Sequence, residues 1–491
     1  MISVIEEVQL NWKANIVAVT SDASGESWAA RKQLVKEFQS LVSADCYAHQ
    51  INLIVGDYFK SSGGTVYLGY SKKASDLISW LRSKTLVLAT LRDIQVALNS
   101  TNSSHPNCVL TVIRAVLTRW TAHYLAFRPL LDLKFALDIL VRQEKSLEQD
   151  SKIVTGDAAS RKKAREMLGL IEDPVMWMTL AQMVSHLQPL SLVINIAQAA
   201  HCHLNEVLII FGFLISRYTV LQGKASSVGE NSMIQAIIDS LEKCWSKCDQ
   251  DVFLAVVVLN PLYRIKPFAR LRKFTNAGLM TLFVKLWEYL EGHGDYGEEF
   301  INWVDLVRSA AERKCPDPLK MYDGIHFQDV EPTPLQKFAQ RIFSICANSA
   351  FCERLFSLFG TVLTKLRSRL GLKGLTDLAE LCLHLRDEYM QMGDKKGRLR
   401  RIRKIIPDPL PPPAIVTITP ADLDSVPDDL SSESEQPETQ DGDTTDDDHS
   451  LGHIASILAQ CSLEDEDPID VGFAFMISPF NNFSTSKTRA G

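Results

Sequence analysis

The feature that most constrains the fold is the succession of long, glycine-poor amphipathic stretches over residues 65–335. Apolar residues recur there at helical spacing, and the region has no convincing series of strands. Prolines interrupt the stretches and mark the ends or kinks of helices. These prolines are Pro106, Pro129, Pro174, Pro189, Pro261 and Pro267. The region is therefore expected to form a large all-helical domain.

The first sixty residues show a different pattern, in which a strand is followed by helices. Residues 15–20 form a short apolar, β-branched run that leads into a Ser-Asp-Ala-Ser-Gly turn. This pattern predicts a buried strand with Asp22 at its C-terminal tip. Apolar residues at helical spacing then predict one helix over 27–42 and a second over 47–58. The opening segment is expected to be α/β.

Two further helices are predicted before residue 391, over 348–370 and 375–390. Each has an apolar stripe at helical spacing, and this spacing is typical of a helix that buries one face. Gly371 and Gly374 supply the break between them, because glycine ends helices readily.

The net charge of −7 conceals an uneven distribution. Residues 407–491 carry 18 Asp and Glu against two basic residues, which leaves about +9 for residues 1–406. A mildly basic body suits a polyanionic partner, although such a bias is more often a solvated surface. Residues 407–450 have too few apolar side chains to fold, so the tail is expected to be disordered. A short helix over 454–463 is expected to form when a partner binds.

The sequence favours a reduced compartment away from membranes. Its ten cysteines are scattered, and no stretch approaches the roughly 18 uninterrupted apolar residues of a membrane-spanning helix. The first residues lack the basic-then-apolar order of a signal peptide. A dense basic run at 395–404 predicts a nuclear location, with the cytoplasm as a second compartment. The plain alternative is a charged helix end before a linker.

Asp22 is the first candidate for chemistry. A carboxylate just after a buried strand can hold a divalent metal against a DNA phosphate. The commoner role of such an Asp is a turn or a helix N-cap, which the neighbouring Ser21 and Ser24 also support. The motif by itself favours the cap.

Two other places depart from ordinary core patterning. Cys46 and His49 share a helix face and would form half of a zinc site, but no second well-spaced pair completes four ligands. Glu353 shares a helix face with Ser357 and could point into a polar cleft. The alternative for Glu353 is a solvated side chain in an early helical turn, where the helix dipole stabilises it.

Taken together, the order of several motifs along the chain and their residues resemble those of the hAT superfamily of transposases. The motifs are TSDAS (20–24), CYAHQINLIV (46–55), TRW (118–120), LNPLYR (259–264), NSAFCERLFSLFG (348–360) and KLRSRL (365–370). They span most of residues 1–390. The ER-x-FS block near residue 353 is the most specific, because it marks the dimerisation region of that superfamily.

The resemblance implies a ribonuclease H-like domain, interrupted by a helical insertion, whose halves assemble an Asp-Asp-Glu site for Mg²⁺ or Mn²⁺. It implies that Asp22 is the second acid and Glu353 the third, and that both are catalytic and bind the metal. Cys46 and His49 match the Cys-x-x-His motif beside that site. Arg354, next to the third acid, is expected to support it.

Trp120 matches a tryptophan of the insertion domain that stacks on a flipped base near the cleaved DNA end. Such stacking contributes roughly 1–3 kcal/mol. A buried core tryptophan is an equally good interpretation of this residue.

The departure from the family pattern decides the expected activity. The first acid lies well upstream of the second in the family, but residues 1–21 contain no Asp, and Glu6 and Glu7 lie in a predicted helix. The zinc-finger DNA-binding module has no counterpart either. We therefore expect a ribonuclease H-like fold that is incomplete at its N-terminus, and strand cleavage that is lost or very weak.

The expected organisation has five parts. They are the N-terminal ribonuclease H-like part (1–62), the helical insertion (63–335), the C-terminal part with the dimerisation region (336–392), a basic segment (393–406) and the acidic tail (407–491). The expected function is a homodimer, formed through the C-terminal region, that binds DNA and takes no small-molecule substrate. The alternatives are an active Mg²⁺-dependent transposase whose true start lies upstream, and a domesticated regulator that binds DNA or proteins without cutting.

Overall fold

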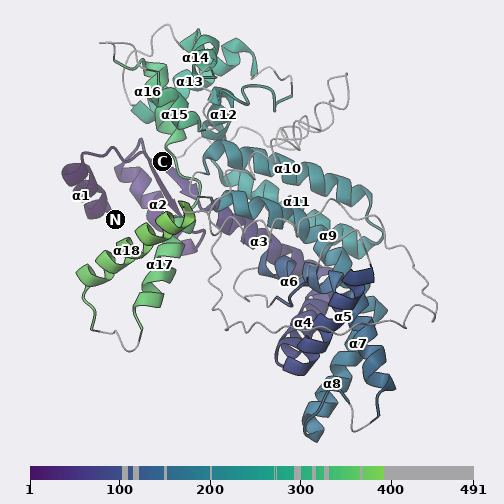
Figure 1. Cartoon of the computed structure of the whole chain (residues 1–491). Coiled ribbons are helices and arrows are strands. Elements are labelled where there is room, and N and C mark those ends of the chain that lie inside the picture. The colour runs from purple at the N-terminus through teal and green to yellow at the C-terminus, as the bar shows by residue number, and fades with distance from the viewer. Residues whose placement is uncertain are drawn as a thin grey trace. The chain divides into compact units, whose positions relative to one another are not determined.

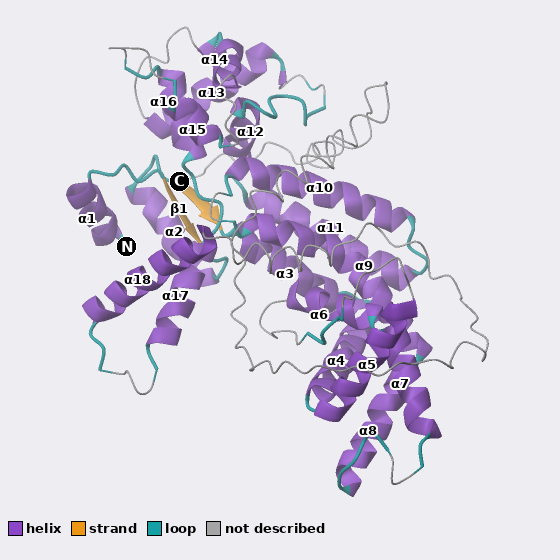
Figure 2. Ribbon diagram, viewed as in Figure 1, coloured by secondary structure: helices purple, strands orange, loops and turns teal. Residues whose placement is uncertain are grey.

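The computed structural model describes residues 1–101, 109–113, 121–148, 152–199, 202–269, 271, 274–291, 300–311, 317–325, 331–364 and 369–391. Within these residues the chain is predominantly helical and has two short strands (Figure 1, Figure 2). They fall into two compact units, Met1–Ala350 and the residues from Phe351 onward. Trp120, the basic segment at 393–406 and the acidic tail at 407–491 lie outside the described residues.

The elements follow one another in a simple order. They are α1 (Ile2–Trp12), β1 (Ala18–Ser21), α2 (Gly25–Glu37), β2 (Val42–Asp45), α3 (Tyr47–Lys60), α4 (Gly64–Arg82), α5 (Thr85–Thr101), α6 (Thr121–Asp132), α7 (Lys134–Ser146), α8 (Ala158–Ile171), α9 (Pro174–Ala197), α10 (Leu204–Gly223), α11 (Val228–Lys247), α12 (Gln250–Leu259), α13 (Asn276–Glu291), α14 (Trp303–Ala311), α15 (Pro318–Asp323), α16 (Pro334–Phe343), α17 (Ala350–Val362) and α18 (Leu372–Gln391).

Strands β1 and β2 are parallel, and helix α2 makes the crossover between them. Ala18 lies opposite Val42, and Ser21 lies opposite Asp45. Parallel strands cannot be joined by a tight hairpin, so a helical connection of this kind is required. Because both strands run in one direction, their carboxyl ends meet at the same edge of the sheet.

The sequence-based prediction for this segment is right about the first strand and α3 and wrong about the second strand. Helix α3 covers the helix predicted over 47–58, and β1 overlaps the predicted strand. The helix predicted over 27–42 ends early, at Glu37. Phe38 leaves the helical conformation, and its N–H donates to the Leu34 carbonyl. The apolar spacing continues past this cap because the following residues are buried by strand pairing.

The sheet has an apolar cluster on each face. Ile5 of α1 packs with Leu34 and Leu41 in a small cluster, and Val19 of β1 joins it. Val42 of β2 contributes instead to the large core of the first unit. Side chains of a strand alternate between faces, so a short strand can contribute to both clusters.

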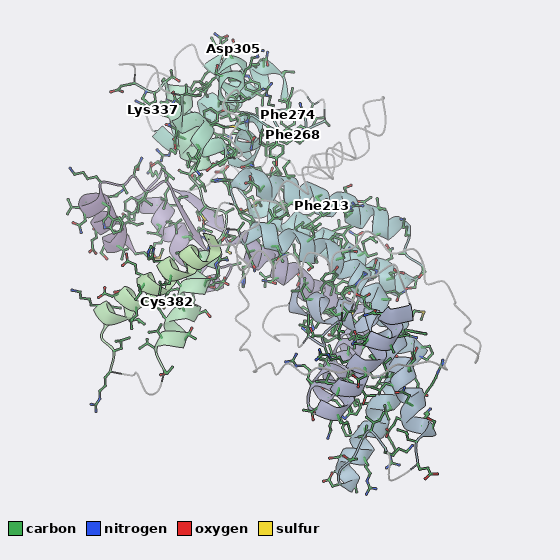
Figure 3. The ribbon with its side chains drawn as sticks, viewed as in Figure 1. Phe213, Phe268, Phe274, Asp305, Lys337 and Cys382 are labelled. Atoms are coloured by element: carbon green, nitrogen blue, oxygen red, sulfur yellow. The ribbon has the colours of Figure 1, made fainter. Side chains whose placement is uncertain are left out.

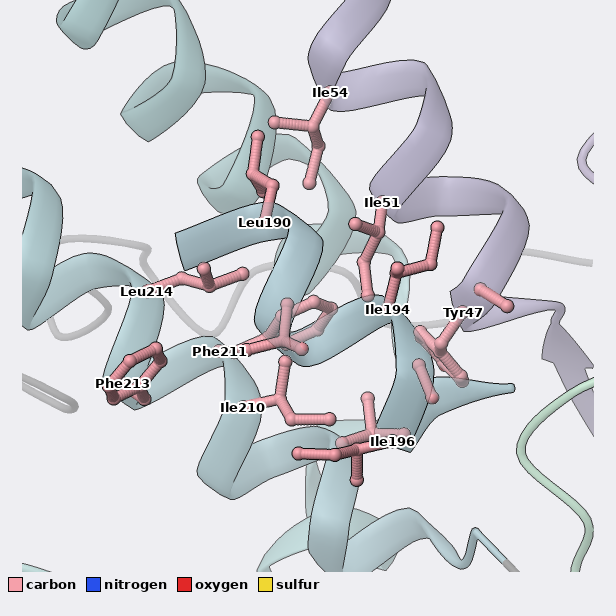
Figure 4. Close-up of a cluster of buried hydrophobic side chains, with 14 of the residues drawn as sticks. Tyr47, Ile51, Ile54, Leu190, Ile194, Ile196, Ile210, Phe211, Phe213 and Leu214 are labelled. Carbon is pink, nitrogen blue, oxygen red and sulfur yellow. The ribbon is translucent and has the colours of Figure 1, made fainter. Parts of the chain in front are cut away.

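Helices α3, α9, α10, α11 and α12 form the centre of the large core (Figure 2). In the close-up of Figure 4, Tyr47 of α3 and Phe211 of α10 come together, and their ring centroids are 5.9 Å apart in an edge-to-face arrangement. Phe253 of α12 meets the same tyrosine ring at 5.5 Å. Three helices thus share one aromatic contact. The described part of 65–335 is helical, as the sequence predicts.

Helix α10 is, among the described helices, the one long and apolar enough to cross a membrane by length and composition. However, 72% of its most apolar window is buried inside the structure. It also carries the buried polar residues Asn205 and Glu206 in its first turn. Such burial is the pattern of a core helix, so its apolarity is explained by the helices around it.

The helices from α12 to α16 continue the first unit around a set of aromatic side chains. Phe268 and Phe274, both labelled in Figure 3, stack with their ring centroids 4.4 Å apart. Phe283 meets Phe338 at 6.2 Å. These rings fix how the loop after α12 returns to the helices that follow it.

The second unit contains α17 from Phe351 onward and α18. Both helices were predicted from the sequence, but the break between them was placed too late. Helix α18 begins at Leu372, so Gly374 lies inside its first turn and not in the connection. Residues 365–368, which are part of the predicted first helix, lie outside the described residues.

Candidate functional site

Two carboxylates follow the parallel strands at the edge where their carboxyl ends meet. Asp22 comes directly after β1, and Asp45 is the last residue of β2. The two strands that position these side chains are half-buried along β1 and buried at Val42 and Ala44 of β2. The site therefore has a rigid base, although the two carboxylates have different surroundings.

Asp22 is held in a turn and is not itself the helix cap. The hydroxyl of Ser24 donates to Asp22 Oδ1 at 3.0 Å. The cap of α2 is Ser24, whose hydroxyl oxygen accepts the Ser27 N–H at 3.2 Å. Hydrogen bonding with Ser27 lowers the pKa of Asp22, and the charge of His49 lowers it further. Asp22 is therefore ionised at neutral pH, as a metal ligand or phosphate-facing acid must be.

Asp45 is neutralised by Arg31, and sequence reasoning missed this pair. Arg31 of α2 is only 3% exposed and forms an ion pair with Asp45 Oδ1. It also donates to the Ser21 hydroxyl and, at 2.8 Å, to the Asp22 carbonyl oxygen. The other oxygen of Asp45 accepts from Gln50 Nε2 at 3.0 Å. The signal that could have revealed the pair is an arginine in the apolar half of a helix.

Cys46 anchors a segment that is distant in the sequence. Its side chain is completely buried, and its sulfur accepts the Ser349 N–H at 3.3 Å. The Tyr47 N–H donates to the Ala347 carbonyl at 3.1 Å. The Thr20 hydroxyl donates to the Cys346 carbonyl at 2.6 Å. Residues 346–349 are thus fixed beside the strand ends, and the role of Cys46 is that of a packing and anchoring residue.

The structure gives no support to a zinc site at Cys46 and His49. His49 is half-buried one turn along α3. In the other cysteine pair, Cys244 is buried and Cys248 is half-buried, and the low-dielectric surroundings raise the thiol pKa values to about 11 and about 12. Both thiols have partners inside the chain: Cys248 Sγ lies 3.3 Å from the Tyr47 hydroxyl, and the Cys244 thiol donates to Gln50 Oε1 at 3.2 Å. Among the described residues, no group of three or more His, Cys, Asp or Glu side chains could hold a metal ion.

The donor set at the strand ends does not by itself fit Mg²⁺. Asp22 offers one ionised carboxylate, but both oxygens of Asp45 already accept hydrogen bonds from Arg31 and Gln50. A magnesium ion prefers octahedral oxygen coordination, commonly through one or two carboxylates together with water and phosphate. Of the two carboxylates at the strand ends, Asp22 is the one whose oxygens are not already held by Arg31 and Gln50.

The remaining residues implied by the resemblance lie elsewhere. Glu353 and Arg354 belong to the second unit, in the first turns of α17. The Glu353 side chain is exposed, which agrees with a solvated carboxylate in an early helical turn. Trp120 lies outside the described residues.

A buried glutamate supports the anchored segment from its other side. His203 pairs with Cys346 in an isolated antiparallel bridge, and its N–H donates to Glu206 Oε2 at 2.8 Å. The side-chain amide of Asn205 donates to the other carboxylate oxygen at 2.7 Å. Burial raises the pKa of Glu206 from 4.5 to about 7, despite these hydrogen bonds. The folded chain therefore favours the neutral acid.

We expect a Glu206→Gln substitution to remove a pH-dependent loss of stability. In the unfolded chain Glu206 ionises near its ordinary pKa, and in the folded chain it ionises near 7, so the folded state binds the extra proton between these values. Stability from this group is full below pH 4.5 and falls as the pH rises through 7, by on the order of 3 kcal/mol. The measurement is the free energy of unfolding by urea at pH 4 to 8.

The difference between the wild type and the Glu206→Gln variant isolates the effect of this one group. At pH 4 both side chains are neutral, so the offset there measures what the amide itself does to the hydrogen bonds with His203 and Asn205. Between pH 4.5 and 7 the wild type should lose stability relative to that offset, and above pH 7 the difference should stay constant. Two pH curves that run parallel would contradict the assignment.

In comparisons with known proteins, no protein-family model and no curated protein matches this chain.

Proposed function

We propose that this chain is a hAT transposase-like protein that forms a homodimer through α17 and α18 and binds DNA without cleaving it. Two observations support the proposal. The first is the motif resemblance, and the second is a parallel β-α-β unit with an ionised Asp22 at the end of its first strand. A ribonuclease H-like arrangement with a helical insertion is the fold that we propose for the whole. A nuclear location belongs to the same proposal and rests on the basic run at 395–404.

For a polypeptide of residues 1–491, the proposed lack of cleavage rests on the count of acids that the resemblance supplies. Asp22 and Glu353 match two of three, and residues 1–21 contain no Asp to match the first. A metal pair that clamps both the attacking and the leaving oxygen needs the full set of ligands. We accordingly propose that a polypeptide of residues 1–491 binds Mg²⁺ or Mn²⁺ too weakly for strand transfer.

The observation that carries dimerisation is the apolar surface of the second unit. Its helices bury few side chains within the unit, among them Val362, Leu375 and Ala379. Large apolar side chains are instead exposed along both helices. They are Phe351, Phe356, Leu363, Leu372, Leu378, Leu381 and Leu385. Leu378, Leu381 and Leu385 recur at helical spacing on one side of α18, and an exposed apolar helix face of this kind usually marks a protein–protein interface.

We expect the wild-type chain to be a dimer in light scattering at micromolar concentration, and a Phe356→Glu/Leu381→Glu variant to be a monomer. Phe356 is 69% exposed and Leu381 is 51% exposed in the single chain. Charged side chains at these positions should therefore destabilise the dimer interface without disturbing the fold of the helices. Leu355 is less suitable, because it is half-buried. Thr376→Glu on the exposed side of α18 is the matched control and should remain a dimer.

A monomeric wild type would overturn the dimer. The enzyme alternative is examined with the same proteins on a terminal-repeat DNA in Mg²⁺. Asp22 favours that alternative, since its carboxylate is ionised and only partly buried. Cleavage that disappears in both Asp22→Asn and Glu353→Gln variants would establish an active transposase, whereas cleavage that survives both would be a contaminant.

A further inference from the structure

Helix α8 presents an unusually basic outer face. Its sequence, AASRKKAREMLGLI, contains four basic residues and one acidic residue. The buried positions are Ala164, Met167, Leu168 and Ile171, which recur at helical spacing and lie on one side. This side packs against α4, α7 and α9, and Figure 1 shows α8 beside α7. The opposite side is therefore left to solvent.

Three of the basic side chains on this face have no acidic partner within the described residues. Arg161, Lys162 and Arg165 are exposed, and no ion pair is formed by any of them. Lys163 differs, since it pairs with Glu166 at 3.7 Å on the flank of the helix. Ala158 and Gly169 also lie on the outer face, and Glu166, which is paired with Lys163, is its one acidic side chain.

The acid nearest the start of α8 does not cancel this charge. Asp157 is the N-cap, and its Oδ1 accepts the Ser160 N–H at 2.8 Å. Its interaction with the helix N-terminus is therefore already satisfied by the helix itself. Lys84, at the turn before α5, lies near enough to lower the pKa of Asp157 further. The three unpaired cations thus face outward without a compensating carboxylate.

A neighbouring hollow lacks this character. It lies between α7 and the start of α9 and includes Lys134, Asp138 and Glu172. Lys134 pairs with Asp138 at 3.0 Å, and Glu172 pairs with Lys145. Arg142 also lines the hollow and has no ion pair among the described residues, so the hollow holds one unmatched cation where the outer face of α8 holds three.

We propose that Arg161, Lys162 and Arg165 on the outer face of α8 bind the phosphate backbone of duplex DNA without reading its sequence. The inference rests on the proposed DNA binding and assigns a surface to it. Arg161 and Arg165 are one turn apart, about 6 Å along the helix axis. Alternate phosphates of one DNA strand are about 7 Å apart along the duplex, and the planar guanidinium group binds phosphate in a bidentate way.

The face favours a nucleic acid over an acidic protein segment. Its three unpaired cations lie within about one helical turn, and the exposed residues between Ala158 and Gly169 are neither aromatic nor large and apolar. Contacts that are made to phosphates alone position a duplex and carry no sequence information. Binding through α8 should therefore be nearly equal for unrelated duplexes and should weaken steeply with salt.

The test compares the full chain with an Arg161→Glu/Lys162→Glu/Arg165→Glu variant. Fluorescence anisotropy is measured with a labelled 30-base-pair duplex over a range of salt concentrations. The matched control is Lys224→Glu/Lys243→Glu/Lys247→Glu, which makes the same change in net charge at exposed positions on α10 and α11. The α8 variant should bind at least about tenfold more weakly, and its salt slope should be shallower by about 2–3. The control should bind within about twofold of the wild type.

Each outcome has a defined meaning. If the wild type binds DNA and the α8 variant binds as tightly as the control, the α8 assignment is wrong while the proposed DNA binding stands. If the wild type does not bind DNA, both fail. Binding of a labelled poly-glutamate peptide that requires α8, without binding of DNA, would assign the face to an acidic protein segment and overturn the proposal. Arg161→Gln/Lys162→Gln/Arg165→Gln replaces the first variant if circular dichroism shows that it is misfolded.

Discussion

An Arg31→Met substitution is expected to destabilise the first unit by about 3–5 kcal/mol, because it leaves a carboxylate without its buried partner. Arg31 is 3% exposed, and the Asp45 side chain is 18% exposed. Methionine can fill much of the same space, so the loss measures charge and hydrogen bonds more than volume. Three acceptors lose their donor at once, namely Asp45, the Ser21 hydroxyl and the Asp22 carbonyl.

The measurement is chemical unfolding followed by circular dichroism, with two comparison variants. Lys32→Met changes the neighbouring residue, which is exposed and lies over the Trp28 ring at 5.2 Å, so its effect should be below about 1 kcal/mol. An Arg31→Met/Asp45→Leu double variant should recover much of the loss, since removal of both charges leaves neither one buried and unpaired. If Arg31→Met behaves like Lys32→Met, the ion pair does not hold the strand ends together.

A Phe211→Ala substitution is expected to cost a similar amount, about 3–5 kcal/mol, through the cavity that it creates in the centre of the core. Phe211 is 1% exposed, and its ring meets Tyr47 edge-on in the cluster of Figure 4. The helices around this position are packed on several sides, so they cannot easily close over the missing ring. Unfolding of the purified chain in urea gives the measurement.

Val220→Ala in the same helix is the control. Val220 is 50% exposed, so its replacement should change the free energy of unfolding by less than about 1 kcal/mol. The difference between the two substitutions also tests whether α10 is apolar because it packs in the core of the first unit. If both substitutions changed the free energy of unfolding by the same small amount, Phe211 would not lie in the buried core.

Local patterns were sufficient to predict the helices but not the second strand. The apolar residues of α3 recur at three and four positions from Tyr47 through Ile51 to Tyr58, and that repeat is contained within one element. The strand β2 has four residues, and it becomes a strand only because β1 lies beside it. The periodicity of apolar residues along the sequence does not indicate which strand will lie beside a given segment.

The candidate site shows the same limit more clearly. The position of Asp22 after a strand was predictable, since it follows from the apolar run before it. Its relation to Ser24 was not, because either residue could have capped α2, and only the geometry assigns the cap to Ser24. The ion pair of Arg31 with Asp45 joins residues on different elements and has no periodic signature.

The anchored segment at 346–349 has a consequence for how the chain is made. Thr20 and Cys346 are separated by 326 residues, and Cys46 and Ser349 by 303. A ribosome adds roughly 5–20 residues per second, so the first strand waits between about a quarter of a minute and a minute for its partner segment to be synthesised. During that interval the Thr20 hydroxyl and the Cys46 thiol lack their native partners, so the β1–α2–β2 segment can complete its hydrogen bonds only after residues 346–349 have left the ribosome.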